Sequence, residues 1–488
     1  MKMKLKIFFF AVFLPSIVFS QKQLTKEQVL EDYEILKNVM TKAHPSLYEY
    51  TSQSEWDELF KNFELEKLQT IQNKGDFYKS ITELTDHVRD GHFIVMRPQL
   101  ASIPKFFPLL LKIIDGKLYT DTDDFGIPLG SEIASIDGID GEELRKKLMK
   151  YAPSDGFNTS KKDRQLEREF GILHFYEFAA KPTYKIIYKT PSNQVFTKNI
   201  DSQSFEEIGK RFPTRSSYFS SYHKSENKSE FVKNTLGKKE PFLYFIDSLK
   251  TAVLTINAFG LEQARFQSEL KDLFKEIKQK KAKQLIIDLR QNEGGYPENA
   301  NFVFSYIARE SFIQPNSQHV ITPQIPHKEH SREIMNGDSY ESFFEKYFQD
   351  ASKTENEWVI YAPENEVSML PAKKGYKGQV YVLVGGRTFS AASSFALNCK
   401  NQGIPLIGEE TGGGYYFHTG VYPVVYELPH SKIKLMMSLV KIKKYVKDKS
   451  VKKGSGVLPD VEIQLSVQDL IEGKDSQLDY VLQLIKKK

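Results

Sequence analysis

The sequence predicts an α/β fold in the carboxy-terminal half, preceded by a helical region and a β-rich region. Three observations carry this prediction. Helical periodicity dominates residues 26–89, short strands dominate residues 106–200, and apolar strands alternate with amphipathic helices from about residue 243 onward. Such alternation is typical of a largely parallel sheet covered by helices. A chain of 488 residues is long enough for about two or three domains.

The first 20 residues have the pattern of a secretory signal peptide. Three lysines precede an apolar run that extends from Ile7 to Phe19, and Ser20 lies at the expected cleavage point. The run contains Pro15 and is shorter than the roughly 20 residues of a spanning helix, which favours cleavage over a membrane anchor. We therefore expect an exported protein, periplasmic or secreted, with no stable membrane span after signal cleavage.

Charge and cysteine content narrow the expected partners. Removing the signal peptide lowers the formal net charge from +5 to +2, which gives no electrostatic reason to expect nucleic acid or an anionic membrane surface as a partner. Cys399 is the only cysteine in the sequence, so the chain cannot form an internal disulfide. The fold must then be held by its hydrophobic cores.

The helical region, residues 21–100, contains the first candidate functional residue. Its first helix is expected to end at His44-Pro45, because proline disfavours helical geometry in the residue before it. At its far end, Asp90-Gly91-His92 forms a turn before the apolar residues 94–96. The imidazole of His92 is thus placed to reach a cleft, although a single histidine in a chain with ten is more often structural.

The β-rich region, residues 101–202, has strands expected at 107–114, 117–120, 132–136, 183–189 and 194–198, and a helix at 142–150. The order of strand, glycine corner, helix and closing hairpin resembles the second half of a PDZ domain, with residues 155–180 as an insertion. This resemblance implies a peptide-docking module that works by strand addition, and the alternative is a β-rich spacer without a ligand. Residues 203–240 are polar and serine-rich and are expected to form a linker.

The last region, residues 241–488, contains the second candidate. The run 380–384 predicts a buried strand, Gly385-Gly386 a turn, and the small residues after Ser390 a closely packed helix. A serine at this turn has its hydroxyl beside unpaired backbone N–H groups at the positive end of the helix, where an oxyanion is stabilised. The alternative is a simple helix N-cap. Residues 337–366 are polar and are expected to form a surface excursion.

Two glycine turns are expected beside Ser390. Asp288-Leu-Arg-Gln-Asn-Glu-Gly-Gly295 follows one buried strand, and Gly408-Glu-Glu-Thr-Gly-Gly-Gly414 follows another. Glycines allow sharp turns that present N–H groups to an anion. Because loops at the carboxyl ends of parallel strands meet at one edge of a sheet, the three turns are expected to share a cleft.

With these motifs, Thr388-x-Ser390-Ala391 and Gly456-Val-Leu-Pro-Asp460, the chain resembles the carboxy-terminal processing (tail-specific) proteases, which include the tricorn-core peptidases. The resemblance covers mainly residues 243–485. It implies an α/β fold of the crotonase and Clp protease kind, a PDZ-like domain, and serine peptidase activity, so that with the signal peptide we expect an exported serine peptidase. It also implies that Ser390 is the nucleophile and that the amide of Ala391, with that of Gly294 or Gly295, forms the oxyanion hole.

One departure from the family pattern concerns the general base. The processing proteases have a lysine just after the Gly-Glu-x-Thr turn, where this sequence has Gly414. The tricorn-like branch uses a histidine ahead of the PDZ-like domain, and Asp90-Gly91-His92 resembles that element, so His92 is the expected base. The residue that orients His92 is left open among Ser455, Glu409 and Glu410.

The expected substrate is an extended polypeptide, docked by its carboxyl end on the PDZ-like domain. No cofactor or metal is expected, since His327-Lys-Glu-His330 lacks a third ligand at recognisable spacing and is interpreted as a surface loop. Two alternatives remain at this stage. One is a catalytically weak or inactive peptide-binding or ligand-binding member of the same fold, and the other is an esterase or amidase for small substrates. The sequence does not determine the oligomeric state.

Overall fold

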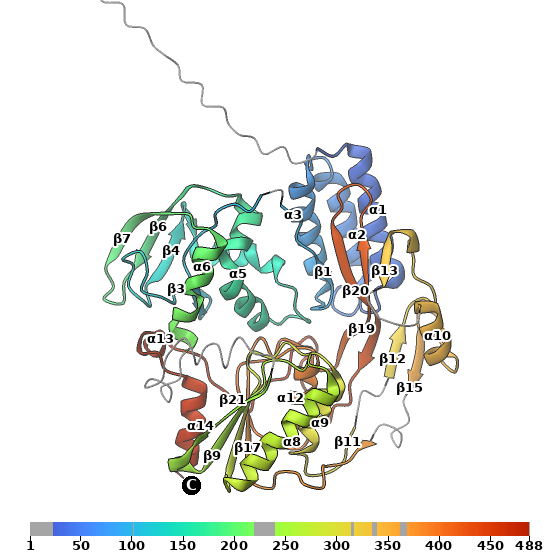
Figure 1. The fold of residues 1–488 in the computed structure, drawn as a ribbon. Helices are drawn as coiled ribbons and strands as arrows, with labels where there is room; N and C mark the ends of the chain where they lie inside the picture. Colours follow the sequence, from blue (N-terminus) through green and yellow to red (C-terminus); the bar gives the residue numbers. More distant parts are fainter. Residues whose placement is uncertain are drawn as a thin grey trace, which may run out of the picture.

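The computed structural model describes residues 23–100, 102–218, 240–313, 317–333, 339–361 and 368–487. The predicted signal peptide and residues 219–239 of the predicted linker lie outside these ranges. Within them, no helix combines the length and the apolar character needed to cross a bilayer. The helical region contributes α1 (Lys26–Ala43), α2 (Gln53–Asn62) and α3 (Lys74–Thr85), grouped at the upper right of Figure 1. Helix α1 ends at the predicted point, where His44 turns extended before Pro45.

A six-stranded sheet forms the centre of the carboxy-terminal half, in the order β21-β18-β17-β10-β9-β8. Its strands are β8 (Phe242–Ile246), β9 (Thr251–Thr255), β10 (Gln284–Asp288), β17 (Gln379–Val384), β18 (Leu406–Gly408) and β21 (Val461–Glu462). Every neighbouring pair is parallel except β8 with β9. The predicted α/β alternation is thus confirmed for this half of the chain.

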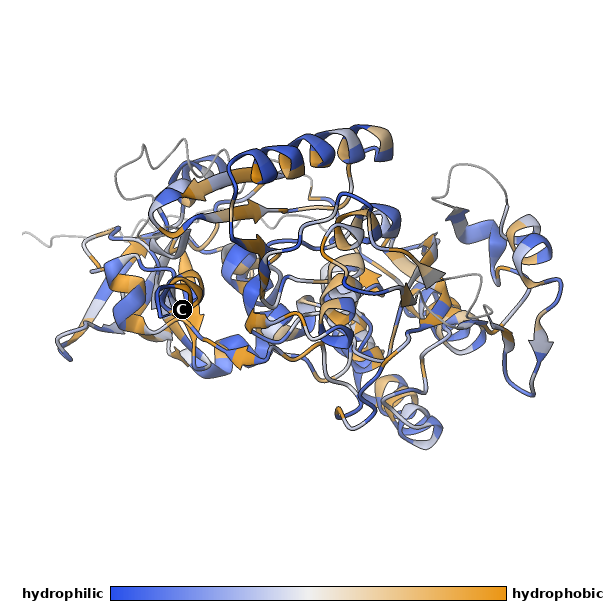
Figure 2. Cartoon of the chain, turned by 90° about the horizontal axis from the view of Figure 1, so that it is seen from below, coloured by the Kyte–Doolittle hydropathy of each residue, from blue (hydrophilic) through white to orange (hydrophobic). Residues whose placement is uncertain are grey.

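Successive strand residues point to opposite sides of this sheet, and the central strands are apolar at all but their end positions. Both faces are therefore apolar, and helices cover each of them. Leu285 and Ile287 join the core beneath α8 (Gln263–Gln279), α9 (Pro297–Ser305) and α12 (Ala391–Asn401). Ile286 joins the opposite core, against α14 (Ser476–Lys486). Figure 2 shows the same division, with hydrophobic colour on strands and inward helix faces and hydrophilic colour on outward faces.

A second, antiparallel sheet joins the helical region to the carboxy-terminal half of the chain. It contains β12 (Ser317–Val320), β13 (Ser331–Glu333), β14 (Ser352–Lys353), β15 (Trp358–Tyr361), β19 (Phe417–Glu427) and β20 (Lys434–Lys443). The short strand β1 (Ile94–Val95), which begins two residues after His92, pairs with β20 through Ile94 and Met436. The surface excursion predicted for residues 337–366 is wrong where the structure describes it, since α10 (Tyr340–Phe348) and β15 pack onto this sheet with Tyr340 and Phe348 buried.

The β-rich region forms a third sheet at the upper left of Figure 1. Its strands are β2 (Leu111–Ile114), β3 (Lys117–Thr120), β4 (Glu132–Ile136), β5 (Ile139–Asp140), β6 (Thr183–Lys189) and β7 (Val195–Asp201). Helix α4 (Gly141–Leu148) follows β5, and the insertion folds into α5 (Ser160–Phe178), which packs against β2. The described part of the predicted linker contains α6 (Phe205–Arg211) and the buried Arg215, bound to Asp121.

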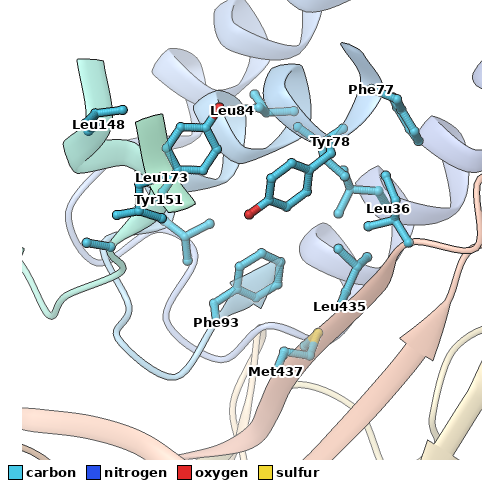
Figure 3. Close-up of a cluster of buried hydrophobic side chains, with 14 of the residues drawn as sticks. Leu36, Phe77, Tyr78, Leu84, Phe93, Leu148, Tyr151, Leu173, Leu435 and Met437 are labelled. Atoms are coloured by element: carbon cyan, nitrogen blue, oxygen red, sulfur yellow. The ribbon is translucent and has the colours of Figure 1, made fainter. Parts of the chain in front are cut away.

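The three regions share one hydrophobic core, which Figure 3 shows around Phe93. Leu36 and Tyr78 come from α1 and α3, Leu148 from α4, and Leu435 from β20. The backbone next to His92 is therefore held by side chains from the helical region, the β-rich region and the antiparallel sheet at once. Burying an aromatic side chain in such a core is worth roughly 2 kcal/mol or more.

Candidate active site

Ser390 lies on the turn between β17 and α12, with backbone angles of φ 53° and ψ −123°. A positive φ is uncommon for a residue with a Cβ, and such strain is concentrated at functional sites. The turn is fixed by the Thr388 hydroxyl, which donates to the Leu289 carbonyl at 2.9 Å and accepts from Gly385 N–H at 3.0 Å. The Ser390 side chain makes no N-cap hydrogen bond to α12, so the alternative of a simple helix cap is not realised.

Glycines let the neighbouring turns approach Ser390. Gly294 has φ +103°, and a Cβ built on it would lie 2.7 Å from Ser390 Cβ. On the other turn, a Cβ on Gly413 would meet the Ser393 hydroxyl at 2.5 Å and Ser390 N at 3.2 Å. The three turns that the sequence places at the carboxyl ends of β10, β17 and β18 therefore do meet at one edge of the parallel sheet.

The candidate oxyanion donors differ in what they already bind. Gly294 N–H donates to Asn292 Oδ1 at 2.9 Å, and Asn292 itself is anchored to the Ile256 carbonyl. Among the described residues, neither Ala391 N–H nor Gly295 N–H donates a hydrogen bond. Of the two glycines that the sequence left open, Gly295 is the one with an uncommitted N–H.

His92 reaches Ser390 from the helical region. Its Nε2 lies 3.2 Å from Ser390 Oγ, across 298 residues of sequence. The ring stacks on Phe389 with centroids 4.6 Å apart, and it is covered by Gly420 of β19, where a Cβ would come within 2.9 Å of Nε2. The side chain is 15% exposed.

The charges around His92 act in opposite directions on its pKa. Burial lowers that pKa below 6.5, and the buried cations Lys161 and Lys444 lower it further, whereas Asp155 and Asp90 raise it. Lys444 is itself affected by burial, which brings its pKa down to about 8. The net effect is a lowered pKa, which keeps the imidazole neutral, as a general base requires, at neutral pH.

Two buried aspartates flank His92. Asp90 Oδ1 lies 3.8 Å from His92 Nδ1 and accepts from His92 N–H at 2.7 Å, and the Thr419 hydroxyl contacts both Asp90 oxygens. Asp155 accepts from Gly91 N–H at 2.7 Å and from Gly414 N–H at 2.8 Å. His92 Nδ1 itself is buried without a hydrogen-bond partner among the described residues.

The carboxylates suggested by sequence are bound elsewhere. Glu410 Oε1 accepts from Gly456 N–H at 2.6 Å, and Glu409 Oε2 lies 3.4 Å from Arg164 Nε. Ser455 takes part in backbone hydrogen bonds with Lys452 and Tyr415. Sequence reasoning therefore missed Asp155, which has no local motif, and passed over Asp90, although it stands in the same Asp-Gly-His element as His92.

One potential ligand atom from each of Asp90, His92 and Asp155 lies within 4.8 Å of the other two, a spacing that a metal ion tolerates. The chemistry of the donors fits a hydrogen-bonded proton-transfer group better. Backbone N–H groups point at both Asp155 oxygens, and His92 Nε2 faces a serine hydroxyl. His327 and His330 lie elsewhere, at the start and end of η8 (Lys328–His330), with their ring centroids 6.5 Å apart.

A cleft of about 550 Å³ opens next to the pair of Ser390 and His92. Its wall includes Phe389, which precedes Ser390, and Glu293, which precedes Gly294. Gly91, which precedes His92, also lines it. The rest of the lining comes from the helical region and from α5, including Met96 and Arg168. The cleft thus lies where the three regions meet, and it is wide enough for a segment of a larger substrate.

Comparison with known proteins identifies the class of enzyme. Residues 250–463 match the model of peptidase family S41, so the protein is a serine-type peptidase. This match covers the region that contains Ser390 and agrees with the family that the motifs predicted, and the substrate class of such a peptidase is polypeptide.

Solved structures of low sequence identity share the fold. Mature CPAF complexed with lactacystin has 14% identity and a TM-score of 0.66, with 95% of this chain and 99% of that chain covered. A second structure of mature CPAF has 13% identity and a TM-score of 0.62, with 95% and 98% covered. These similarities support the mixed α/β fold with its helical and β-rich regions. Curated protein sequences give no match.

Proposed function

We propose that this chain is an exported serine peptidase that cleaves polypeptides through an acyl-enzyme on Ser390, with His92 as the general base. The observation that carries the proposal is the 3.2 Å approach of His92 Nε2 to Ser390 Oγ, which joins a strained serine to a buried imidazole. A nucleophile within hydrogen-bond reach of its base is the arrangement that activates a serine hydroxyl. The lysine base of the processing proteases has no counterpart at Gly414.

The proposed reaction has two halves. Ser390 Oγ attacks the carbonyl carbon of the scissile bond while its proton passes to His92 Nε2, and the carbonyl oxygen becomes an oxyanion facing Ala391 N–H and Gly295 N–H. His92 then returns the proton to the leaving amine as the C–N bond breaks. In the second half, water attacks the acyl-enzyme by the same route and frees Ser390.

We also propose that the peptidase domain has a fold of the crotonase and Clp protease kind and that the β-rich region is a PDZ-like domain. The β2 edge of the third sheet is a poor candidate for strand addition. Ile113 N–H donates to Glu167, the Ile113 carbonyl accepts from Arg164, and the Leu111 carbonyl accepts from Arg215. The opposite edge strand, β7, carries exposed side chains at Val195 and Phe196, so a docked peptide would add there.

The test measures hydrolysis of unfolded casein and of an extended fluorogenic peptide by the purified protein. Wild type and Ser394→Ala, a neighbouring serine on α12, are expected to cleave both substrates, and Ser390→Ala neither. Equal cleavage by Ser390→Ala would exclude the assigned nucleophile. Cleavage only of a small ester, with no peptide turnover, would favour the esterase alternative. Comparing peptides with a free and an amidated carboxyl end tests docking by that end.

A further inference from the structure

The segment of residues 154–161, here called the crossing segment, enters the catalytic centre from the β-rich region. It begins one residue before the predicted insertion and ends in the first turn of α5. Gly156 N–H donates to the Arg89 carbonyl at 2.8 Å, which ties the segment to the turn that carries His92. It contacts loops of the carboxy-terminal half as well, because Phe157 N–H donates to the Gly454 carbonyl at 2.8 Å and the Ser160 hydroxyl donates to the Glu410 carbonyl at 2.8 Å.

The segment fits only because its neighbours are glycines. A Cβ on Gly156 would lie 2.2 Å from the Gly454 carbonyl oxygen, and a Cβ on Gly386, at the turn before Ser390, would lie 2.4 Å from the Ser160 backbone. Lys161 Nζ, at the end of the segment, lies 4.6 Å from the centre of the Phe389 ring, and the same ring stacks on His92. The crossing segment therefore packs against both the turn that carries Ser390 and the ring that contacts His92.

Asp155 is the only carboxylate in this segment. Its two oxygens are fixed by Gly91 N–H, next to His92, and by Gly414 N–H, on the glycine turn beside Ser390. One oxygen of Asp155 and one of Asp90 lie within 4.8 Å of a ring nitrogen of His92. Asp90 Oδ1 lies 3.8 Å from His92 Nδ1, which is buried without a hydrogen-bond partner among the described residues. A proton on Nδ1 would therefore face negative charge, which leaves the Nε2 lone pair for the Ser390 hydroxyl.

We propose that Asp155 is the positioning residue for His92, so that the β-rich region supplies the carboxylate that completes the catalytic centre. This inference rests on the proposed function. When His92 accepts the Ser390 proton, a positive charge forms close to the side chains of Asp90 and Asp155, which stabilise the imidazolium more than the neutral imidazole. Asp90 contributes charge too, but its oxygens also bind Thr419 and lie 3.1 Å from His44 Nε2, so it holds the turn itself.

The pH behaviour separates this role from a purely structural one. The charged or titratable groups that face His92 are Asp90, Asp155, Lys161, Lys444 and His418. Asp155 raises the pKa of His92, so Asp155→Asn is expected to lower that pKa further. The acid limb of the pH–rate profile, where His92 becomes protonated and the rate falls, should then move to lower pH. Loss of a structural contact alone would reduce the amount of active protein without moving the limb.

The experiment measures the rate at which a fluorophosphonate labels Ser390 between pH 5 and pH 9. Asp155→Asn is expected to react at least about 100-fold more slowly than wild type at pH 8, with its acid limb at lower pH. Asp123→Asn removes an exposed carboxylate from the same region and is expected to match wild type. Labelling of Asp155→Asn within threefold of wild type, with an unchanged limb, would overturn the proposal.

A second variant and a second measurement keep the test decisive. Phe157→Ala loosens the crossing segment at a side chain that is 51% exposed, and it is expected to fold, to slow labelling, and to shift the limb in the same direction by less. Titration of the His92 ring by NMR in Ser390→Ala protein needs no activity. A His92 pKa unchanged by Asp155→Asn would overturn the inference, whereas absence of wild-type labelling at Ser390 would sink only the proposed function.

Discussion

Ser390 and His92 meet at one point, but the two residues are held in different ways. Ser390 is positioned by a single parallel sheet, whose strands β10, β17 and β18 end in three adjacent glycine turns. His92 is positioned at a junction, with Phe93 beside it buried among side chains from the helical region, the β-rich region and β20. The nucleophile is therefore a property of one domain, and its base exists only when three parts of the chain are docked.

The largest effect is expected from breaking the nucleophile's turn. Gly294→Ala places a Cβ 2.7 Å from Ser390 Cβ at φ +103°, so the backbone must move. We expect kcat/KM to fall by a factor on the order of 10³ or more, since oxyanion geometry is lost as well. Gly403→Ala, at φ +65° with open space around it, is the control for glycine replacement alone and is expected to keep its activity.

A smaller effect is expected from disturbing the base through the distant strand β19. Gly420→Ala brings a Cβ to 2.9 Å from His92 Nε2, at φ +121°. Because a displacement of about 1 Å at a reacting group costs roughly 100-fold, kcat should fall by about that factor while KM changes little. An unchanged kcat in a folded Gly420→Ala protein would show that β19 does not restrict the imidazole.

Core substitutions distinguish the junction from the sheet. Phe93→Leu in the shared core and Phe274→Leu beneath the parallel sheet remove similar buried volume, so each should lower the free energy of unfolding by about 1–2 kcal/mol. Only Phe93→Leu is expected to reduce kcat, by about tenfold, because it alone loosens the backbone of His92. Denaturant unfolding and peptide hydrolysis measure the two quantities, and equal kcat values would contradict the comparison.

The smallest expected effect is a change in pH dependence. His92 must be neutral to act as a base, and its pKa lies below 6.5, so activity should persist into mildly acidic solution. Lys444 is a cation in this range and lowers the His92 pKa, so Lys444→Met should raise that pKa and move the acid limb to higher pH. This direction is opposite to the one expected for Asp155→Asn. A shift to lower pH would contradict the charge assignment.

The same contrast explains how much the sequence could predict. Strand, turn and helix around Ser390 are encoded in consecutive residues, so the local pattern gives them with nearly correct bounds. The distant His92 came from its resemblance to a family motif, and its distance from Ser390 could not be read from any spacing. Asp155 follows no motif, because its role depends on how the crossing segment docks.

The strand pairing of the antiparallel sheet could not be predicted from local sequence patterns either. Strands β12 and β15 are separated by 37 residues between Val320 and Trp358, and β1 joins β20 from more than 300 residues away. Pairing of this kind depends on tertiary contacts, which override local propensity. Polar residues 337–366 therefore suggested a surface loop, although Tyr340 and Phe348 fill a core.

The measurement that tests the central claim most directly is covalent labelling of the intact protein by a fluorophosphonate at pH 8, with the adduct mapped by mass spectrometry. The adduct is expected on Ser390 in wild type and in Ser394→Ala, and its rate of formation should fall by a factor on the order of 10³ or more in His92→Ala. An adduct on another residue, or labelling of Ser390 that is unaffected by His92→Ala, would contradict the pairing of these two residues.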